Sequence, residues 1–485
     1  MKNKFRPKFH FTPKVGYMND PNGLIYNRKT KHYHLFYQYC ADLDMMNEDE
    51  YFGSWVEKNW GHAISKDLIH WEEKEPVLAK DRIGNIWSGT CAIDRGNTFG
   101  VFPEESDPED RFVCSYACAN NEPIKGYGKI SCCLGYSIDG GDEWKKYANN
   151  PVIANENNHF DEAFGDPKIF WLEEENNPNG GVWVMITVLK VRIFTSSNLR
   201  DWEFQSVASI KGEPFYSECP DIFMVTVGKN KKWVYSGAGK YYIIGDFVRD
   251  DSGKLTFVAE SEKIDVSIGN LYATQHFYNL PNERIIQISW MGDHSSLDFK
   301  KEGKTWDGAQ SIPIELTVEK SECQNDKYLL KFNPAKELEQ MREEKVLAIE
   351  NKTYEGEVSD FNGVCLQTFD LDAIFDVSQT DEFCLKFRKG DGEYTKLTYT
   401  KSKGEVEVNT YFSGRLIHEH HHLPFDKKDG KLSLRVLCDT TILDVFVQNG
   451  ESYKSMMFFP SEQSNGFSMN VKGVLKIEKL DLYKV

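Results

Sequence analysis

Three acidic residues stand in corresponding places in the sequence, although they are far apart along the chain. Asp20, Asp166 and Glu218 each lie in a polar cluster that opens a short apolar segment. If the fold brings these segments together, one carboxylate can attack or stabilise a sugar while another donates a proton. Nearby tryptophans favour a sugar, because their rings stack on its C–H faces. Calcium also prefers oxygen ligands, but a DxDxDG-type loop is absent.

Recurring strand-like runs predict how these residues are positioned. Five buried-strand patterns begin about 50 to 80 residues apart, which leaves room for four short strands each. A polar turn followed by tryptophan recurs in phase with them. Four strands per repeat, arranged radially, predict a five-bladed β-propeller, and an irregular β-sandwich is the alternative. The runs are 33–39, 111–118, 182–188, 232–239 and 284–292, and the tryptophans are Trp71, Trp144 and Trp202.

The first strand of each propeller blade lines the central channel, so equivalent positions in different blades converge on the axis. Asp20, Asp166 and Glu218 belong to the first, third and fourth units. The sequence therefore predicts one pocket with three carboxylates at the mouth of the channel.

The C-terminal part of the chain has a different pattern. The propeller is expected over residues 1–332, and residues 333–345 predict a short connecting helix because they contain good helix formers after a proline. Residues 346–485 return to alternating strands, and Asn449-Gly450 is typical of a hairpin turn. This length suits a β-sandwich. The expected fold class is all-β, a five-bladed β-propeller followed by a C-terminal β-sandwich.

Composition limits the classes of partner. The 485 residues carry 58 basic and 75 acidic side chains, a net charge of −17 that disfavours nucleic acid and anionic membranes. The 11 cysteines suggest neither a disulfide framework nor a zinc site. No signal peptide is evident at the N-terminus, so a cytoplasmic protein is expected. We expect a small sugar as the substrate, no cofactor or metal, and a monomer or homodimer.

Several segments resemble glycoside hydrolase family 32, the invertase, inulinase and levanase group. Six motifs occur in the family's order and span nearly the whole chain. They are 17–23 (YMNDPNG), 36–39 (FYQY), 60–63 (WGHA), 67–71 (DLIHW), 87–90 (WSGT) and 217–221 (SECPD).

The resemblance implies a retaining hydrolase of terminal β-fructofuranosides, such as sucrose, fructo-oligosaccharides or a related small fructoside. Asp20 would form a covalent fructosyl-enzyme, Glu218 would be the acid and base, and Asp166 would stabilise the transition state through fructose hydroxyls. Cys219 follows the acid and either tunes it or packs as a small buried residue. The positions implied to line the sugar subsite are Asn19, Gln38, Trp55, Trp60, Trp87 and Ser88.

Two departures from the family pattern bear on specificity. The family's Arg-Asp-Pro motif reads Gly165-Asp166-Pro167 here, so an arginine that would bind fructose is missing. Lys190 or Arg192 could supply the cation instead. Residues 40–54 form an acidic insertion that either reshapes the pocket rim or is a solvated loop. The alternatives are therefore a fructosyltransferase, a hydrolase of an atypical fructoside such as a difructose anhydride, or a non-catalytic sugar-binding protein.

Overall fold

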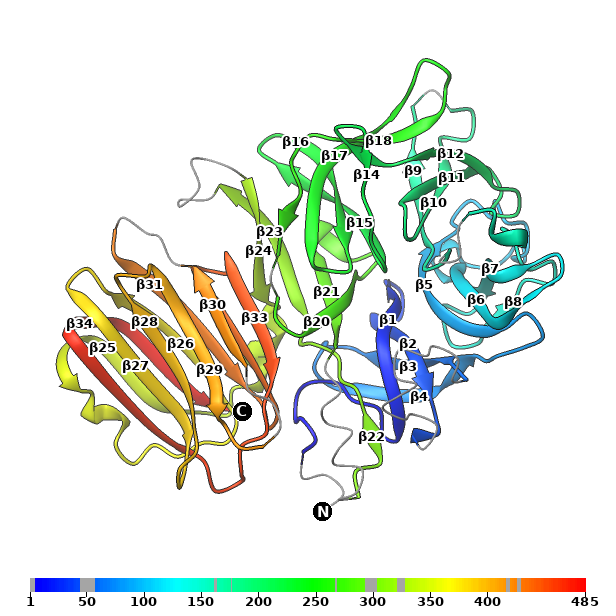
Figure 1. Cartoon of the computed structure of the whole chain (residues 1–485). Helices are drawn as coiled ribbons and strands as arrows, with labels where there is room; N and C mark the ends of the chain where they lie inside the picture. The colour runs from blue at the N-terminus through cyan, green and yellow to red at the C-terminus, as the bar shows by residue number, and fades with distance from the viewer. Residues whose placement is uncertain are drawn as a thin grey trace.

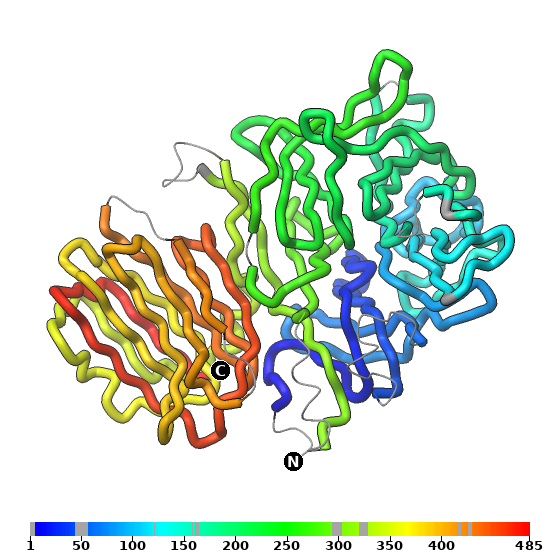
Figure 2. Tube along the Cα trace, in the orientation of Figure 1, coloured from blue at the N-terminus to red at the C-terminus, as the bar shows by residue number. Residues whose placement is uncertain are grey.

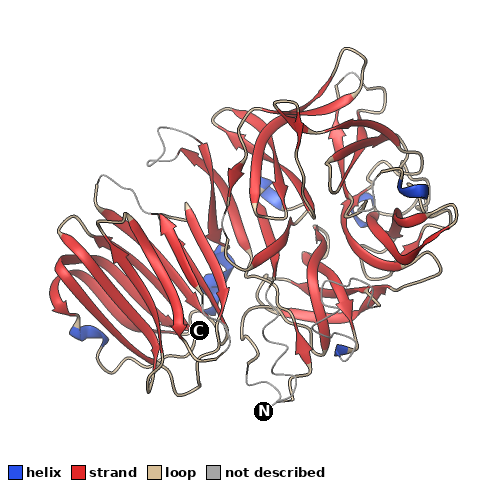
Figure 3. Ribbon diagram, in the orientation of Figure 1, coloured by secondary structure: helices blue, strands red, loops and turns tan. Residues whose placement is uncertain are grey.

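The computed structural model describes residues 5–43, 57–160, 164–175, 177–266, 268–292, 303–320, 328–415, 419–424 and 429–485. Strands dominate, with a few short 3-10 helices between them (Figure 3). A ring of sheets forms the N-terminal part, and a layered sheet structure lies beside it (Figure 1). None of the helices in these ranges has the length and apolar character needed to cross a membrane.

The N-terminal part is a β-propeller built from five mainly antiparallel sheets. The first contains β1 (Gly16–Asn27), β2 (His32–Cys40), β3 (Asn59–Ser65), β4 (Trp71–Leu78) and β22 (Trp306–Asp307). The second contains β5 (Asn85–Ile93), β6 (Phe112–Ile124), β7 (Gly128–Ser137) and β8 (Lys145–Lys146), and the third β9 (Lys168–Glu173), β10 (Gly181–Thr187), β11 (Arg192–Ser196) and β12 (Glu203–Val207). The fourth contains β13 (Ser209–Ile210), β14 (Glu213–Pro214), β15 (Pro220–Val227), β16 (Asn230–Gly237), β17 (Tyr241–Arg249), β18 (Leu255–Ala259) and β19 (Ile264–Asp265). The fifth contains β20 (Leu271–His276), β21 (Ile285–Met291), β23 (Ile314–Lys320) and β24 (Tyr328–Pro334).

The ring closes where late segments meet the first sheet. β22 pairs in parallel with Gly16 and Tyr17 of β1. Tyr26 N–H donates to the Tyr278 carbonyl over 2.9 Å, and Tyr278 N–H donates to the Leu24 carbonyl over 2.8 Å. These backbone bonds hold the first and fifth sheets together, so strands from distant parts of the sequence surround one centre.

The recurring tryptophan motif forms the same turn in three sheets. Each indole N–H donates to the carbonyl oxygen three residues earlier, at 2.7 to 3.2 Å. Each acceptor residue has a left-handed φ between 64° and 113°, which sets the turn before the outer strand. The pairs are Trp71 with Leu68, Trp144 with Gly141 and Trp202 with Leu199. These tryptophans therefore serve the fold, as the repeat predicted.

Burial patterns explain why the two parts differ. All seven residues of β10 are buried, because a blade is covered on both faces by its neighbours. In β29 (Glu405–Phe412), by contrast, buried Val406, Val408 and Thr410 alternate with more exposed residues, as expected for a sheet with one face on a core. Period-two alternation in the C-terminal part therefore reflects a two-layer structure.

The C-terminal part is a β-sandwich whose layers share one long strand. The half of β34 (Gly466–Lys484) up to Gly473 pairs with β27 (Thr380–Lys389), while its second half pairs with β26 (Phe369–Asp376). The apolar core between the layers includes Phe369, Phe387 and Phe467. The remaining strands are β25 (Glu344–Glu357), β28 (Tyr394–Thr400), β30 (His420–Pro424), β31 (Lys431–Cys438), β32 (Ile442–Val447) and β33 (Ser452–Met457).

The connection between the two parts is shorter than the expected helix over 333–345. A 3-10 helix spans only Lys336–Met341. Asn333 and Pro334 instead pair with Glu315 and Ile314 as the end of β24, and sheet pairing there overrides the helical propensity. Further 3-10 helices of the described residues span Pro108–Asp110, Glu156–Asn158, Pro281–Glu283 and Ser359–Phe361.

An apolar core joins the propeller to the sandwich. Phe332 and Leu338 on the propeller side belong to the same buried cluster as Phe446, Met457 and Phe459 of the sandwich. Figure 2 shows the C-terminal strands running beside the last sheet of the propeller. This shared core makes the two parts one packed unit.

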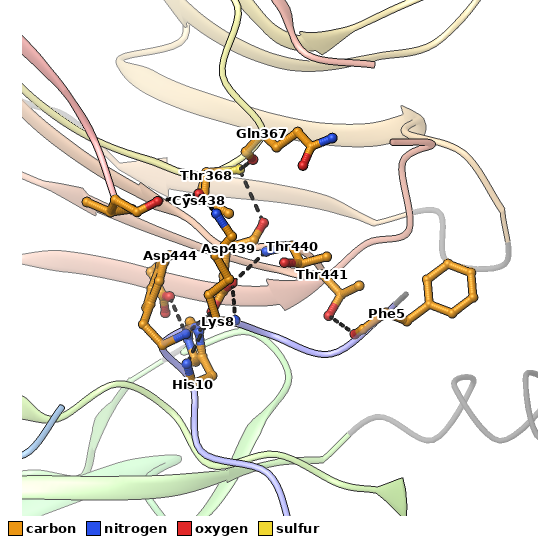
Figure 4. Close-up of polar contacts among 12 residues, drawn as sticks. Phe5, Lys8, His10, Gln367, Thr368, Cys438, Asp439, Thr440, Thr441 and Asp444 are labelled. Atoms are coloured by element: carbon orange, nitrogen blue, oxygen red, sulfur yellow. Dashed lines mark hydrogen bonds and ion pairs between the residues drawn. The ribbon is translucent and has the colours of Figure 1, made fainter. Parts of the chain in front are cut away.

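The N-terminal segment is clamped to the sandwich through buried carboxylates (Figure 4). Asp439 accepts backbone hydrogen bonds from Lys8, Phe9 and His10 at 2.7 to 3.1 Å. The imidazole of His10 bridges Asp439, at 2.9 Å from Nδ1, and Asp444, at 3.0 Å from Nε2. All three side chains are fully buried. We refer to His10, Asp439 and Asp444 as the histidine clamp.

Candidate active site

The three carboxylates predicted from the repeat meet in one cavity of about 240 Å³. Asp20 comes from β1, Asp166 from the loop before β9, and Glu218 from the loop before β15. The cavity therefore lies where the first, third and fourth sheets converge. The ring topology, rather than local sequence, creates the site.

A bulge in β1 aims Asp20 into this cavity. The register between β1 and β2 shifts between Met18 and Pro21, which bends the strand at the aspartate. Oδ1 of Asp20 accepts a hydrogen bond from the Asn19 amide over 3.1 Å. Oδ2 accepts from Gln38 Nε2 over 3.2 Å and from Ser88 Oγ over 2.6 Å. Gln38 also bonds Ser88, so the carboxylate is held in one orientation.

Asp166 is placed by an uncommon backbone conformation. Its φ is 41°, in the left-handed region that few non-glycine residues adopt. Its Oδ2 accepts the backbone N–H of Cys219 over 3.1 Å. Burial and the neighbouring charge of Asp20 raise the pKa of Asp166 to about 7. Asp166 is thus a carboxyl group that changes its charge near neutral pH.

Glu218 occupies a more open position than the two aspartates. Its side chain is exposed, and its Oε2 accepts a hydrogen bond from the Tyr272 hydroxyl over 2.8 Å. Burial, together with the hydrogen bond to Glu218, raises the pKa of Tyr272, so the phenol stays protonated as a donor. A carboxyl group with access to solvent can exchange protons with both a leaving group and water.

Cys219 touches two of the three carboxyl groups and is also buried. Its Sγ lies 3.5 Å from Asp20 Oδ2 and 3.7 Å from Asp166 Oδ2. Burial and the charge of Asp20 raise the pKa of the thiol well above its usual value, so it is a neutral donor. Cys219 is therefore a small buried residue, as one sequence interpretation has it, and its thiol contacts the two aspartates of the site.

A buried polar network ties three sheets together. Asp221 of β15 pairs with Lys168 of β9 at 2.8 Å and with His276 of β20 at 2.9 Å. Burial alone would raise the pKa of Asp221, but His276 and Lys168 lower it. The network fixes the inner strands that position Asp166 and Glu218.

Two family models cover most of the chain. Residues 10–331 match the glycosyl hydrolases family 32 N-terminal domain, and residues 337–484 match the glycosyl hydrolases family 32 C terminal model. The chain belongs to glycosyl hydrolase family 32. It is therefore a glycoside hydrolase, and the resemblance inferred from its motifs is confirmed.

Individual relatives agree with the family models. The levanase of Bacillus subtilis (strain 168) is 30% identical over 99% of this chain and 70% of its own length. The fructan beta-fructosidase of Streptococcus mutans serotype c is 26% identical over 99% of this chain, which spans only 33% of that protein. The crystal structure of exo-inulinase from Aspergillus awamori is similar with a TM-score of 0.82 at 25% identity, covering 99% of this chain and 98% of that one.

The residues that resemble the family 32 sugar subsite differ in how they reach the cavity. Asn19, Gln38 and Trp87 line it, and Ser88 lies behind Asp20 as a hydrogen-bond donor. Trp60 does not line it, because the ring is fully buried and its Nε1 donates to the Trp87 carbonyl over 2.9 Å. Its role is to support Trp87. Trp55 and most of the insertion at 40–54 lie outside the described residues.

The hypothesis that Lys190 or Arg192 replaces the family arginine is not supported by the geometry. Neither side chain lines the cavity. The guanidinium of Arg192 is buried and donates to the carbonyls of Val188 and Lys190, each over 3.3 Å. Two of the guanidinium's hydrogen bonds therefore go to backbone of the turn between β10 and β11.

The sequence pattern did not identify every polar residue of the cavity. Lys58 and Tyr272 both line it. Tyr272 directly precedes the polar cluster that opens the fifth unit, so its place in the repeat was a usable signal. Lys58 lies two residues before the 60–63 motif, and no repeat marks it.

The raised pKa of Asp166 predicts that Asp166→Asn stabilises the fold at alkaline pH while it impairs activity. Folded protein holds the Asp166 proton up to about pH 7, whereas the unfolded chain releases it near 3.8. The free energy of unfolding of the wild type therefore falls as pH rises between these values. Asp166→Asn has no such proton to lose, so its free energy of unfolding should exceed that of wild type by up to about 4 kcal/mol at pH 8.

Denaturant unfolding at pH 8 and pH 5 measures this gain. We expect a larger difference between variant and wild type at pH 8 than at pH 5. Asp251→Asn, at an exposed turn, is the control and should show no pH-dependent gain. A variant no more stable than wild type at pH 8 would show that Asp166 carries no buried-charge penalty.

Proposed function

We propose that this protein is a retaining β-fructofuranosidase that removes terminal fructosyl units from a small fructoside, such as sucrose or a fructo-oligosaccharide. The observation that carries the proposal is the meeting of Asp20, Asp166 and Glu218 in one cavity of a family 32 chain. The levanase and exo-inulinase names of similar proteins support fructosides as the substrate class.

In the first step, Asp20 attacks the anomeric carbon of the fructosyl unit. Its Oδ2 accepts from Gln38 and Ser88, whereas Oδ1 accepts only from Asn19 among the described donors, so Oδ1 is the freer nucleophile. Glu218 donates its proton to the glycosidic oxygen as the C–O bond breaks. The products are the free leaving group and a fructosyl ester of Asp20.

In the second step, the Glu218 carboxylate takes a proton from water, and the resulting nucleophile attacks the same carbon. The ester bond breaks, the Asp20 carboxylate is regenerated, and fructose leaves with its original β configuration. Asp166 hydrogen-bonds fructose hydroxyls and stabilises the positive charge that develops in both transition states. Tyr272 orients Glu218 through its 2.8 Å hydrogen bond.

The size of the cavity supports attack at chain ends. Its volume of about 240 Å³ lies below the roughly 300–1,000 Å³ of sites that enclose drug-sized ligands. One sugar ring fills such a space, so the rest of the substrate must extend outward past Glu218. Cleavage inside a long fructan would need a groove open at both ends.

The wider organisation is part of the same proposal. The five N-terminal sheets act as five blades within residues 1–332, and residues 346–485 form a separate sandwich domain that braces them. We propose a cytoplasmic enzyme acting on small imported sugars. A non-catalytic binding protein is disfavoured, because loss of catalysis usually removes a reacting carboxylate and all three line the cavity.

Turnover of a substrate panel tests the proposed activity. Free fructose and transfer products would be measured with sucrose, sucrose 6-phosphate, inulobiose, short inulin oligomers and a difructose anhydride. We expect turnover of at least one, reduced about 10²- to 10⁴-fold in Glu218→Gln. Transfer products in excess of free fructose would indicate a transferase. No turnover of any of these, with sugar binding retained, would support a binding protein.

A further inference from the structure

Lys58 places an amino group in the wall of the carboxylate cavity. It lies directly before β3 and shares the cavity with Asp20 and Asp166. Among the described residues that line this cavity, it is the only lysine or arginine. Burial lowers the pKa of Lys58, while the charges of Asp20 and Asp166 act in the opposite direction. The ammonium is therefore held near two carboxylates in a poorly solvated place.

The ammonium of Lys58 has no direct partner among the residues that the structure describes. Within the part of the chain that the structure describes, it forms no hydrogen bond or ion pair, and its interactions with Asp20 and Asp166 are through space. An ammonium has three donors and no acceptor. Leaving such a group partly buried without acceptors costs free energy, so the arrangement suits a ligand that brings acceptor oxygens.

Gly165 lines the same cavity as Lys58 and contributes no side chain to it. A Cβ atom at this position would lie 3.2 Å from Ala117 Cβ and 3.4 Å from Ile130 Cγ2, so the wall is closely packed as it stands. A cation in this cavity can therefore come only from Lys58 among the described lining residues.

We propose that Lys58 binds the sugar by donating hydrogen bonds to fructosyl hydroxyl oxygens, in a site where Asp166 accepts the hydroxyl hydrogens. The inference rests on the proposed fructosidase function and names one of its specificity-determining contacts. A hydroxyl is both donor and acceptor, so it fits between an ammonium and a carboxylate. Two adjacent ring hydroxyls would link Lys58 to Asp166 without bringing their charges into direct contact.

Replacing Lys58 is expected to change KM more than kcat. The hydroxyl groups that Lys58 would bind take no part in bond breaking, so its hydrogen bonds are made in the ground state as well as in the transition state. Lys58→Met is expected to raise KM about 10- to 100-fold with less than a tenfold change in kcat. Lys58→Arg keeps the charge and should restore KM to within about tenfold of wild type.

Steady-state kinetics on the best fructoside, with thermal melting of each variant, tests this role. Lys66→Met is the matched control, because Lys66 is exposed just beyond the other end of β3, and its KM should match wild type. Wild-type turnover with an unchanged KM in a folded Lys58→Met variant would overturn the proposal for Lys58. Absence of wild-type turnover would instead overturn the proposed function.

Monodeoxy fructosides sharpen the test. Deleting the hydroxyl that Lys58 binds and substituting Lys58→Met should each lower kcat/KM. The two losses should not add, because both remove the same contact. At the other hydroxyls the losses should add. Additive losses at every hydroxyl would show that Lys58 acts through the protein fold rather than on the sugar.

Discussion

Replacing Asp20 with asparagine is expected to lower kcat by at least about 10⁴-fold. The amide has nearly the same shape and still accepts hydrogen bonds from Ser88 and Gln38, whose donors surround it at 2.6 and 3.2 Å. It cannot form a stable ester with the fructosyl carbon. The loss is therefore one of chemistry, and KM and the melting temperature should change little. Initial-rate kinetics with the preferred substrate measure kcat and KM, and thermal melting measures the stability.

The contrast with Glu218 distinguishes a nucleophile from a proton donor. With an aryl fructoside whose leaving group needs no protonation, Glu218→Gln should recover the first step and accumulate the fructosyl-enzyme. Asp20→Asn should remain inactive on the same substrate. Asp251→Asn is the control for replacing a carboxylate with an amide. Recovery of Asp20→Asn by the activated substrate would assign the nucleophile elsewhere.

Breaking the histidine clamp is expected to destabilise the whole chain by about 3–5 kcal/mol. His10→Leu leaves Asp439 and Asp444 buried without a counter-charge, and both lose a bond of 2.9 to 3.0 Å to the imidazole. Three backbone N–H groups of the N-terminal segment still bind Asp439. Because both carboxylates lose the imidazole, the variant should unfold at a lower denaturant concentration than wild type, as measured by tryptophan fluorescence.

The clamp also predicts a pH dependence of stability. Burial lowers the pKa of His10, but Asp444 and Asp439 outweigh it and raise the pKa from 6.5 to about 9. A raised pKa means that the stabilisation is complete below pH 6.5 and is lost as pH rises through about 9. The difference in free energy of unfolding between wild type and His10→Leu should therefore shrink as the pH rises from 6.5 to about 9.

An exposed histidine–aspartate pair provides the control for the clamp. His70 contacts Asp67 at 2.8 Å with 86% of the His70 side chain exposed, so His70→Leu should cost at most about 1 kcal/mol. Equal effects of the two substitutions, or a His10 effect that grows between pH 6.5 and 9, would contradict a buried ion network.

The sequence predicted the carboxylates because they recur with the fold. Asp20 lies in the first half of an inner strand, and Asp166 and Glu218 lie just before one, so the repeat alone placed them together. Tyr272 shares that position in the fifth unit, yet its chemistry as a donor to Glu218 depends on side-chain geometry. Lys58 has no repeat partner, and only the closed ring shows that it faces the site.

The expectations that did not hold failed for physical reasons. Trp60 belongs to a motif of the family, but its ring is buried behind Trp87 and serves packing. Arg192 bonds backbone carbonyls of its own turn. The histidine clamp joins His10 to Asp439 across more than 400 residues, and no local pattern reports a contact at that separation.

The stereochemistry of fructosyl transfer to methanol tests the central claim most directly. If Asp20 forms a covalent intermediate and Glu218 activates the acceptor, both displacements invert and the early product is methyl β-fructofuranoside alone. Nuclear magnetic resonance of the reaction in dilute methanol identifies the anomer, because the methyl glycoside does not mutarotate. Formation of methyl α-fructofuranoside would contradict the double displacement and the roles of both carboxylates.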